Sequence, residues 1–409
     1  MRIAFVDLVF SWPPNGGADV DLYHTIAGLQ SAGHEVRLFV PSADTWERGA
    51  FDPVALPFPS TRIPFTRLGL RPGPVAQGLR DAVDAWRPEA VFIADGFFFK
   101  PALIEALAHY PCVGRFYAYE IACMRDLLLY KDGAPCPCNY LVTPDTCRAC
   151  ALEGMKDGIR RWRFLTWTHE YLAAGAFLPS YHARLAKALG KLRAAIVYNP
   201  LQAEHLRGYC DRVHVVPGGV NVADYESTPI PAKDASAKKV ILMAGRVEDP
   251  MKGLAVLRAA GERLWRERQD FEIWATHTDR SLNSPWFKSI GWHTPAGLKA
   301  FYRDADICVV PSIWEEPFGL VAVEAMASGR PVCVSRVGGL QSIVAHGETG
   351  YVFERGDDAG LAAHLGELLD DAGLRDGMGR AGRQRAETEY DWDKIIARNY
   401  PAILGDLEP

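Results

Sequence analysis

The sequence predicts an α/β protein of two domains, each with helices packed on both faces of a parallel sheet. The chain has 409 residues, which is more than one ordinary hydrophobic core accommodates. Short apolar runs alternate with helical stretches, as in parallel sheets. A polar segment at 227–239 interrupts this alternation, which then starts again. We therefore expect an N-terminal domain at 1–226, a C-terminal domain at 227–389 and a final helix at 390–409.

The first domain begins with a strand predicted at 2–8, because this apolar run ends in a loop rich in Pro and Gly. In the helix that follows, Leu22, Ile26 and Leu29 recur at i, i+4 and i+7 and share one face. Gly33 ends this helix. Further strands are predicted at 35–40, 90–95, 112–119, 194–199 and 213–217.

The second domain repeats the alternation, with strands predicted at 239–246, 271–276, 307–312, 331–336 and 350–354. The strand at 307–312 delivers Pro311 and Ser312 just before an expected helix. Pro317 occupies the position where this helix would start, and Gly329 the position where it would stop.

Composition and charge exclude two classes of protein. The net charge of -5 provides no basic surface of the kind that binds nucleic acid. No apolar run reaches the roughly 18–20 residues that cross a bilayer. The N-terminus does not read as a signal peptide, because Asp7 lies among its apolar residues and no small-residue cleavage site follows. We expect a cytoplasmic protein and leave open a peripheral contact with a membrane surface.

The strongest chemical signal is a pair of glutamates around the start of the expected helix. Glu316 and Glu324 lie eight residues apart, which corresponds to about 12 Å along a helix axis. That span suits a folded nucleotide sugar, with Glu316 at the sugar hydroxyls and Glu324 at the ribose hydroxyls. The N–H groups near Phe318, Gly319 and Leu320 would form an anion site for phosphate. The alternative is an N-capping acid and a solvated helix acid.

The continuous string at 316–332, EPFGLVAVEAMASGRPV, favours the first reading. It resembles the glutamate–seven–glutamate signature of retaining glycosyltransferases of the GT-B fold, in particular the group that includes sucrose synthase (family four). The resemblance implies two Rossmann-like domains that face each other across a cleft, with the final helix crossing back to the first domain. It also implies transfer of a sugar from a UDP-, GDP- or other nucleoside diphosphate sugar to an unidentified acceptor hydroxyl on a glycan, a lipid-linked molecule or a small molecule.

Two cations at 244–253 support this resemblance. Arg246 and Lys252 follow a strand of the second domain, and a parallel sheet binds ligands beyond the carboxyl ends of its strands. Two cations there would stabilise the charge on a leaving diphosphate, and the resembled family has an Arg and a Lys at these positions. The predicted catalytic residues are therefore Glu316, Arg246 and Lys252, unless the two cations are simply solvated.

Glycine turns and a departure from the family complete the resemblance. Gly16 and Gly17 resemble the family's glycine-rich loop, which passes close to the diphosphate, although a Gly-Gly pair also makes an ordinary turn. The turn with Gly338 and Gly339 would let the backbone approach a ligand. At 115–123 many relatives have a histidine near the anomeric carbon. This chain has none there, and Tyr117 or Glu120 are the candidates to replace it.

A cysteine-rich insertion at about 123–150 contains two close pairs. Cys136, Cys138, Cys147 and Cys150 would supply four thiolates for a tetrahedral structural zinc. Free or regulatory thiols and disulfides are the alternatives. Asp-x-Asp triplets occur only in helical or pre-strand contexts, so no catalytic metal is expected.

The segment at 158–171 mixes arginines with tryptophans and a phenylalanine. This pattern is typical of an interfacial helix, which would indicate a lipid-linked acceptor, or of a packed helix with a basic edge. Two other functions remain open for the chain: a nucleotide-sugar epimerase of the same fold, and a non-catalytic sugar-binding protein stapled by zinc.

Overall fold

The computed structural model describes residues 1–43, 51–66, 69–160, 166–225 and 237–407. The chain divides into two compact units. The first unit comprises Met1–Pro217 together with Ile396–Pro409, and the second comprises Gly218–Ile395. Most of the segment predicted to link the domains, 227–239, lies outside the described residues.

The first unit contains a seven-stranded parallel sheet in the order β3-β2-β1-β4-β5-β8-β9. Its central strands are buried on both faces, which explains why they read as continuous apolar runs. The strands are β1 (Arg2–Val6), β2 (Glu35–Ser42), β3 (Ser60–Pro64), β4 (Ala90–Ile93), β5 (Cys112–Arg115), β8 (Ala194–Val197) and β9 (Val213–Val215).

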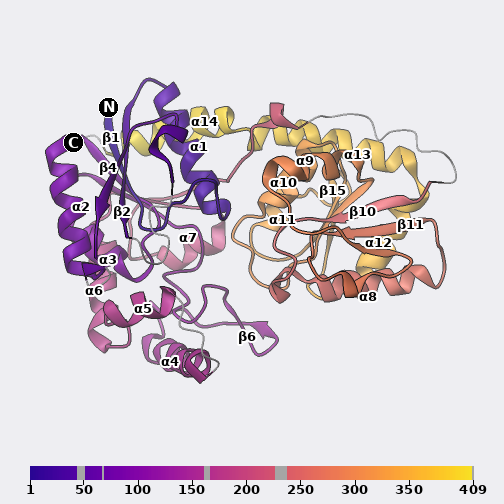
Figure 1. Ribbon diagram of the computed structural model, residues 1–409, viewed down its shortest axis with the longest axis horizontal. Coiled ribbons are helices and arrows are strands. Elements are labelled where there is room, and N and C mark those ends of the chain that lie inside the picture. The colour runs from indigo at the N-terminus through magenta and orange to yellow at the C-terminus, as the bar shows by residue number, and fades with distance from the viewer. Residues whose placement is uncertain (44–50, 67–68, 161–165, 226–236, 408–409) are drawn as a thin grey trace. The chain divides into compact units, whose positions relative to one another are not determined.

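Helices cover both faces of this sheet. Figure 1 shows α2, α3 and α6 together on one face and α1 on the other. The helices of this unit are α1 (Gly17–Ser31), α2 (Pro72–Trp86), α3 (Lys100–Leu107), α4 (Pro144–Arg160), α5 (Thr166–Ala173), α6 (Pro179–Leu189) and α7 (Pro200–Leu206). A short antiparallel hairpin, β6 (Tyr130–Lys131) with β7 (Ala134–Pro135), lies in the cysteine-rich insertion.

The last helix, α14 (Trp392–Gly405), contributes its C-terminal residues to the first unit. Its Tyr400 hydroxyl bonds the Thr25 hydroxyl of α1 at 3.1 Å. Ile396 lies so close to Gly28 of α1 that a Cβ at that glycine would be 2.7 Å from the isoleucine side chain. Glycine at position 28 therefore allows the two helices to pack closely.

The second unit contains a six-stranded parallel sheet in the order β12-β11-β10-β13-β14-β15. Helices α8 and α12 cover one face, and α9 and α10 the other (Figure 1). The strands are β10 (Lys239–Met243), β11 (Phe271–Ala275), β12 (Phe287–Ser289), β13 (Ile307–Val310), β14 (Val332–Ser335) and β15 (Gly350–Phe353). The helices are α8 (Leu254–Trp265), α9 (Pro295–Asp304), α10 (Leu320–Ala327), α11 (Leu340–Ile343), α12 (Asp358–Asp370) and α13 (Ala372–Arg385).

The α/β class with two parallel sheets, as predicted, is confirmed. Leu22, Ile26 and Leu29 are buried on one face of α1, and Gly33 follows that helix with a φ of 91°. Within the described residues, we find no helix that combines the length and the apolar character needed to span a membrane.

Candidate functional site

The parallel sheet of the second unit brings together two loops that are far apart in the sequence. Strand β10 pairs with β13, so their carboxyl ends lie at the same edge of the sheet. The loop after β10 contains Arg246 and Lys252, and the loop after β13 contains Glu316. The three residues predicted to be catalytic therefore belong to neighbouring loops.

These two loops contact each other through their backbones. The Ile313 N–H donates to the Met251 carbonyl at 2.9 Å. Gly253 has a φ of 81°, and a Cβ there would lie 1.9 Å from the Pro311 carbonyl oxygen. Only glycine permits this approach, and the close packing sets the position of Lys252, the residue before it.

Lys252 and Glu316 form an ion pair in the structure. The ammonium nitrogen lies 3.1 and 2.9 Å from the two carboxylate oxygens, and the Ser312 hydroxyl donates to Oε2 at 3.0 Å. The lysine side chain is 27% exposed and that of the glutamate 11%. The lysine is therefore not a solvated cation. An ammonium has three N–H donors, so one remains for a ligand beyond the two that point to the carboxylate.

Arg246 lies in the same loop with an exposed side chain. The loop is anchored immediately after Arg246: Val247 is buried, and Glu248 accepts hydrogen bonds from the backbone and hydroxyl of Thr278, both at 3.0 Å. Partial desolvation raises the pKa of Glu248, but hydrogen bonds to its carboxylate, including those from Thr278, bring the pKa below its usual value. The structure thus presents one exposed and one half-buried cation at this edge of the sheet.

The helix that carries the motif begins later than the sequence indicates. Helix α10 starts at Leu320, with Gly319 as its N-cap, so the prediction that Pro317 opens it is wrong. Gly319 has a φ of 109°, outside the helical region, so the helix cannot continue through it from Pro317. A Cβ at this position would lie 2.2 Å from the side chain of Leu340, which favours glycine there. Within the first turn of α10, the Ala322 N–H donates to the Gly319 carbonyl at 2.9 Å. The binding of phosphate by the N–H groups near Phe318, Gly319 and Leu320 stays a prediction.

A glycine turn after β14 holds the backbone of Glu316. The Gly339 N–H donates to the Glu316 carbonyl at 2.8 Å, and the Gly338 N–H donates to the Glu315 carboxylate at 2.7 Å. Arg355 forms an ion pair with Glu315. In the structure this turn approaches the glutamate motif, and its approach to a ligand stays a prediction. The sequence analysis assigned no role to Ser312 or Glu315, which precede Glu316 by four residues and by one residue.

Glu324 is buried in the second turn of α10, so the alternative of a solvated helix acid is wrong. It is 8% exposed, and burial raises the pKa of its carboxyl group. The hydroxyl of Tyr302 donates to Oε2 at 2.8 Å and that of Tyr225 to Oε1 at 3.2 Å. The sequence carries no local signal for either tyrosine, because they reach Glu324 from distant parts of the chain.

The remaining predicted nucleotide-binding residues belong to the first unit. Gly16 caps α1 with an extended backbone, and Gly17 opens that helix with nothing within 4 Å of a Cβ. Asp19, in the first turn, accepts hydrogen bonds from the backbones of Ser11 and Asn15 and so ties the loop to the helix. The contact of this loop with a diphosphate stays a prediction.

Of the two candidates to replace the family's histidine, Glu120 is already engaged. Its carboxylate accepts from the buried Lys100 ammonium at 3.1 Å and from the Ala118 N–H at 3.0 Å. These bonds hold the turn after β5. Tyr117 instead lines a small cavity, and burial raises the pKa of its hydroxyl well above the usual value.

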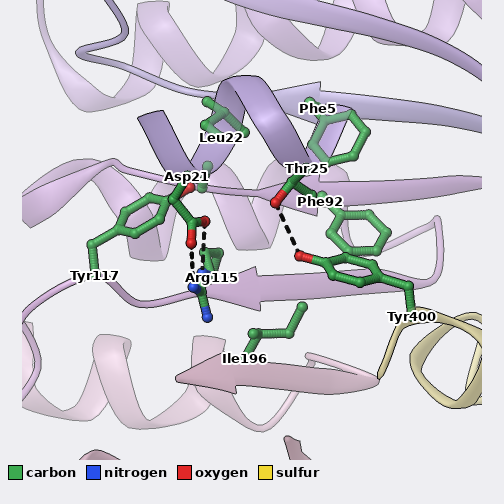
Figure 2. Close-up of a pocket in the computed structure, with 10 residues that line it drawn as sticks. Phe5, Asp21, Leu22, Thr25, Phe92, Arg115, Tyr117, Ile196 and Tyr400 are labelled. Carbon is green, nitrogen blue, oxygen red and sulfur yellow. Dashed lines mark hydrogen bonds and ion pairs between the residues drawn. The ribbon is translucent and has the colours of Figure 1, made fainter. Parts of the chain in front are cut away.

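That cavity lies inside the first unit and is polar on one side (Figure 2). Arg115 donates to both oxygens of Asp21, at 3.2 and 2.7 Å, and Figure 2 shows this ion pair beside the bond between Thr25 and Tyr400. The volume of the cavity, ≈ 10 Å³, is about that of one water-sized sphere. The cavity is therefore too small for a sugar and forms part of the internal polar packing.

The cysteine side chains do not assemble into the predicted zinc site. Cys138 and Cys147 pack against the core of the first unit, whereas Cys150 accepts a hydrogen bond from Arg125 at 3.7 Å. All nine cysteines, Cys136 included, are free thiols. In the part of the chain that the structure describes, no group of three or more Cys, His, Asp or Glu side chains could hold a metal ion. This arrangement lends no support to zinc at these four cysteines, and the zinc site stays a prediction.

The arginine- and tryptophan-rich segment at 158–171 is described only in part, because 161–165 lie outside the described residues. Within α5, Trp167 stacks on Tyr171 with ring centroids 5.4 Å apart and contacts the edge of Phe98 at 5.0 Å. This part of the segment belongs to a helix packed on the core.

Comparison with known proteins agrees with the geometry of the second unit. Residues 238–371 match the family model described as Glycosyl transferases group 1. A phosphatidyl-myo-inositol mannosyltransferase of Mycobacterium leprae is 31% identical over 243 residues, which cover 58% of this chain and 64% of that protein. The chain thus spans somewhat less than two thirds of the length of this relative.

Two solved structures superpose on almost the whole chain. Sucrose-phosphate synthase from Thermosynechococcus elongatus has a TM-score of 0.68 at 18% identity and covers 100% of this chain and 99% of its own. HepE from Anabaena, solved in complex with UDP-glucose, has a TM-score of 0.68 at 15% identity, with coverages of 99% and 100%. At these identities the likeness establishes the fold. The chain therefore has the GT-B fold, and its second unit is similar in sequence to the group 1 glycosyl transferases.

Proposed function

We propose that this protein transfers a sugar from a nucleoside diphosphate sugar to an acceptor hydroxyl. The observation that carries the proposal is the Lys252–Glu316 pair at the sheet edge, beside the start of α10 and in the loop next to Arg246. These residues lie within the segment that matches the group 1 family. HepE, which shares the fold, was solved with UDP-glucose.

The cations provide a site for the diphosphate. Lys252 retains one N–H donor beyond those that point to Glu316, and Arg246, an exposed residue in the same loop, carries a planar guanidinium of the shape that suits phosphate. The partial positive charge at the start of α10 adds to this field. Charge that develops on the leaving diphosphate would meet groups that are already in place.

Glu316 is suited to hold the transferred sugar. Its carboxylate is fixed by Lys252 and by the Ser312 hydroxyl, and its backbone is fixed by Gly339. An ionised carboxylate has about four acceptor sites, so oxygen lone pairs remain for sugar hydroxyls. Orientation of the donor in this way lowers the barrier by reducing the entropy that the reaction step must lose.

The proposed reaction requires no group beyond donor and acceptor. The bond between the anomeric carbon and the diphosphate oxygen breaks, and the acceptor oxygen forms a new bond to that carbon. The diphosphate leaves with the bonding electron pair and takes the proton of the acceptor hydroxyl. Attack on the face that the diphosphate vacates retains the anomeric configuration, as the resemblance to the family implies.

Thermal unfolding with a panel of nucleotide sugars and nucleoside diphosphates tests this proposal first. A ligand that binds only the folded protein stabilises it by about 2.7 kcal/mol at a hundredfold excess over its dissociation constant. The donor that shifts the melting temperature is then incubated with candidate acceptors, and the anomeric configuration of the product is read by NMR. Absence of any shift across the panel would refute the proposal, and inverted product would refute retention.

A variant pair tests the site itself. Glu316→Gln removes the carboxylate from the proposed sugar site, and we expect at least a hundredfold loss of turnover with little change in melting temperature. Glu354→Gln is the matched control, because that glutamate forms an exposed ion pair with Arg336 and should leave turnover unchanged. Normal turnover in the Glu316 variant would show that the site is assigned wrongly. Conversion of the donor sugar to its epimer without an acceptor would indicate the epimerase instead.

A further inference from the structure

Glu324 is a buried acid whose direct side-chain partners are neutral. It is 8% exposed, and its two carboxylate oxygens accept from the hydroxyls of Tyr225 and Tyr302 at 3.2 and 2.8 Å. A carboxylate buried for structural reasons is usually ion-paired, because desolvation of an uncompensated charge is costly. Lys299 is near enough to favour the charged carboxylate, but its ammonium bonds Asp224 at 3.2 Å.

The two tyrosines reach Glu324 from separate elements. Tyr302 lies in α9 and is 1% exposed, and Tyr225 lies just before the residues that the structure does not describe and is 8% exposed. Their rings meet edge to face with centroids 6.4 Å apart. The Tyr225 carbonyl accepts from Arg383 at 2.7 Å, and the same guanidinium nitrogen also bonds the Ala327 carbonyl at the end of α10. Helix α9, the segment that ends at Tyr225 and helix α10 are thus linked to one another, and together they hold the Glu324 carboxylate in one orientation.

The arrangement leaves acceptor capacity on a fixed carboxylate. An ionised carboxylate has about four lone-pair sites, and the tyrosine hydroxyls use one on each oxygen. A vicinal diol presents two O–H donors, which match one remaining site on each oxygen. A lysine or arginine partner would instead have compensated the charge directly, and the carboxylate would then attract a neutral diol less strongly.

We infer that Tyr302 and Tyr225 are positioning residues that orient Glu324 to bind the ribose diol of a nucleoside diphosphate. The inference rests on the proposed function and on the prediction from the sequence that Glu324 meets the ribose hydroxyls of the donor. Tyr302, with the shorter bond and the more deeply buried ring, supplies the main constraint, and Tyr225 the weaker one.

The same contacts predict a pH effect on binding. Burial raises the pKa of Glu324, and the two tyrosine hydroxyls lower it. The titratable groups that face it are Tyr225, Tyr302, Lys299 and Cys308. Binding of the diol requires the ionised carboxylate. Loss of the Tyr302 hydroxyl raises the pKa of Glu324 further, so affinity should begin to fall at a higher pH as the solution is acidified.

Calorimetric titration of the full chain and of Tyr302→Phe tests the inference with three kinds of probe. The probes are UDP and GDP, their 2′-deoxy counterparts and inorganic pyrophosphate. We expect the variant to bind UDP or GDP about tenfold more weakly. Loss of a hydrogen bond to a charged group, here from Tyr302 to the Glu324 carboxylate, typically corresponds to about a tenfold change or more in an equilibrium constant. Its preference for ribose over 2′-deoxyribose should fall toward one, while its affinity for pyrophosphate should not change.

Tyr351→Phe is the matched control. The Tyr351 hydroxyl donates to the Glu367 carboxylate at 2.7 Å in the same unit, so this variant loses the same kind of bond away from Glu324. All three kinds of probe should bind to it as they bind to the unchanged protein. Tyr225→Phe leaves α9 intact and provides a second test if Tyr302→Phe unfolds, with an expected severalfold loss of the ribose preference.

Several outcomes would overturn the inference. It is wrong if Tyr302→Phe and Tyr225→Phe keep the ribose preference of the unchanged protein, or if they lose affinity for pyrophosphate to the same extent as for the nucleotides. Failure of the unchanged protein to bind any nucleoside diphosphate would instead refute the proposed function and the inference with it. Normal nucleotide binding with an unaltered preference in the variants would refute the inference alone.

Discussion

Gly338→Ala perturbs the contact that fixes the backbone of Glu316. Gly338 has a φ of 42°, and a Cβ there would lie 2.1 Å from the Glu316 carbonyl oxygen and 2.9 Å from its nitrogen. The clashing atoms belong to the backbone, so no side-chain rotation relieves the overlap. The turn after β14 must move away from the loop after β13, and the glutamate is expected to move with it.

The cost has two separable parts. A non-glycine residue in the left-handed region costs about 1–2 kcal/mol, offset by about 0.4–1 kcal/mol because alanine has less conformational freedom than glycine in the unfolded chain. Gly347→Ala isolates this part, since Gly347 has a φ of 81° and nothing within 4 Å of a Cβ. Overpacking against the backbone adds about 1–3 kcal/mol at Gly338 only.

Thermal unfolding and nucleotide titration of both variants provide the assay. In a unit of this size each kcal/mol lowers the melting temperature by about 2–4 °C, so Gly338→Ala should melt several degrees below Gly347→Ala. Only the first variant should lose affinity for the nucleotide sugar, because only its substitution displaces Glu316. Equal melting temperatures and equal affinities in the two variants would refute the proposed link between the glycine turn and the glutamate.

Buried and half-buried charges provide three further tests. Lys252→Met removes the ammonium that bonds both carboxylate oxygens of Glu316. Calorimetry should show that the affinity for a nucleoside diphosphate falls by about tenfold to a hundredfold. An unchanged affinity would exclude Lys252 from the diphosphate site. Asp21→Asn leaves the buried Arg115 without its carboxylate partner and should destabilise the first unit by about 3–5 kcal/mol in thermal unfolding. Glu35→Gln, which breaks an exposed ion pair, should cost less than about 1 kcal/mol. Equal losses of stability in the two variants would contradict this expectation. Burial and a neighbouring carboxylate raise the pKa of Asp7 from 3.8 to about 7. The protonated Asp7 carboxyl therefore contributes to the free energy of unfolding below pH 3.8, and this contribution is lost as the pH rises to about 7. Asp7→Asn should therefore flatten this part of the dependence of melting temperature on pH, and an unchanged profile would show that another group is responsible.

Most strands were predictable because the central strands of a parallel sheet are buried on both faces and read as continuous apolar runs. The strands β3 and β12 were missed. Both lie at the edge of their sheets, and their residues alternate or mix polar and apolar side chains. Strand β5 ends at Arg115, earlier than expected, because the chain turns where Glu120 bonds the Ala118 N–H.

The candidate site was predictable to a lesser extent. Its charged residues stood out because Glu316 and Glu324 occur in a nearly continuous motif. The start of α10 did not follow from local rules: Pro317 is a good first helical residue, but the positive φ of Gly319 delays the helix. The cysteine spacing suggested a metal site, but spacing along the chain does not determine where Cys150 points.

The sequence by itself determined the alternation of strands and helices and the acidic and basic groups of the site, because periodicity and motif spacing are local properties of the chain. Only the tertiary structure decided which of those groups contact each other. Lys252 meets Glu316, and Tyr302 and Tyr225 meet Glu324, across sequence separations of 64, 22 and 99 residues. Such contacts depend on strand order, helix packing and the close backbone approaches at glycine, which no local pattern in the sequence encodes.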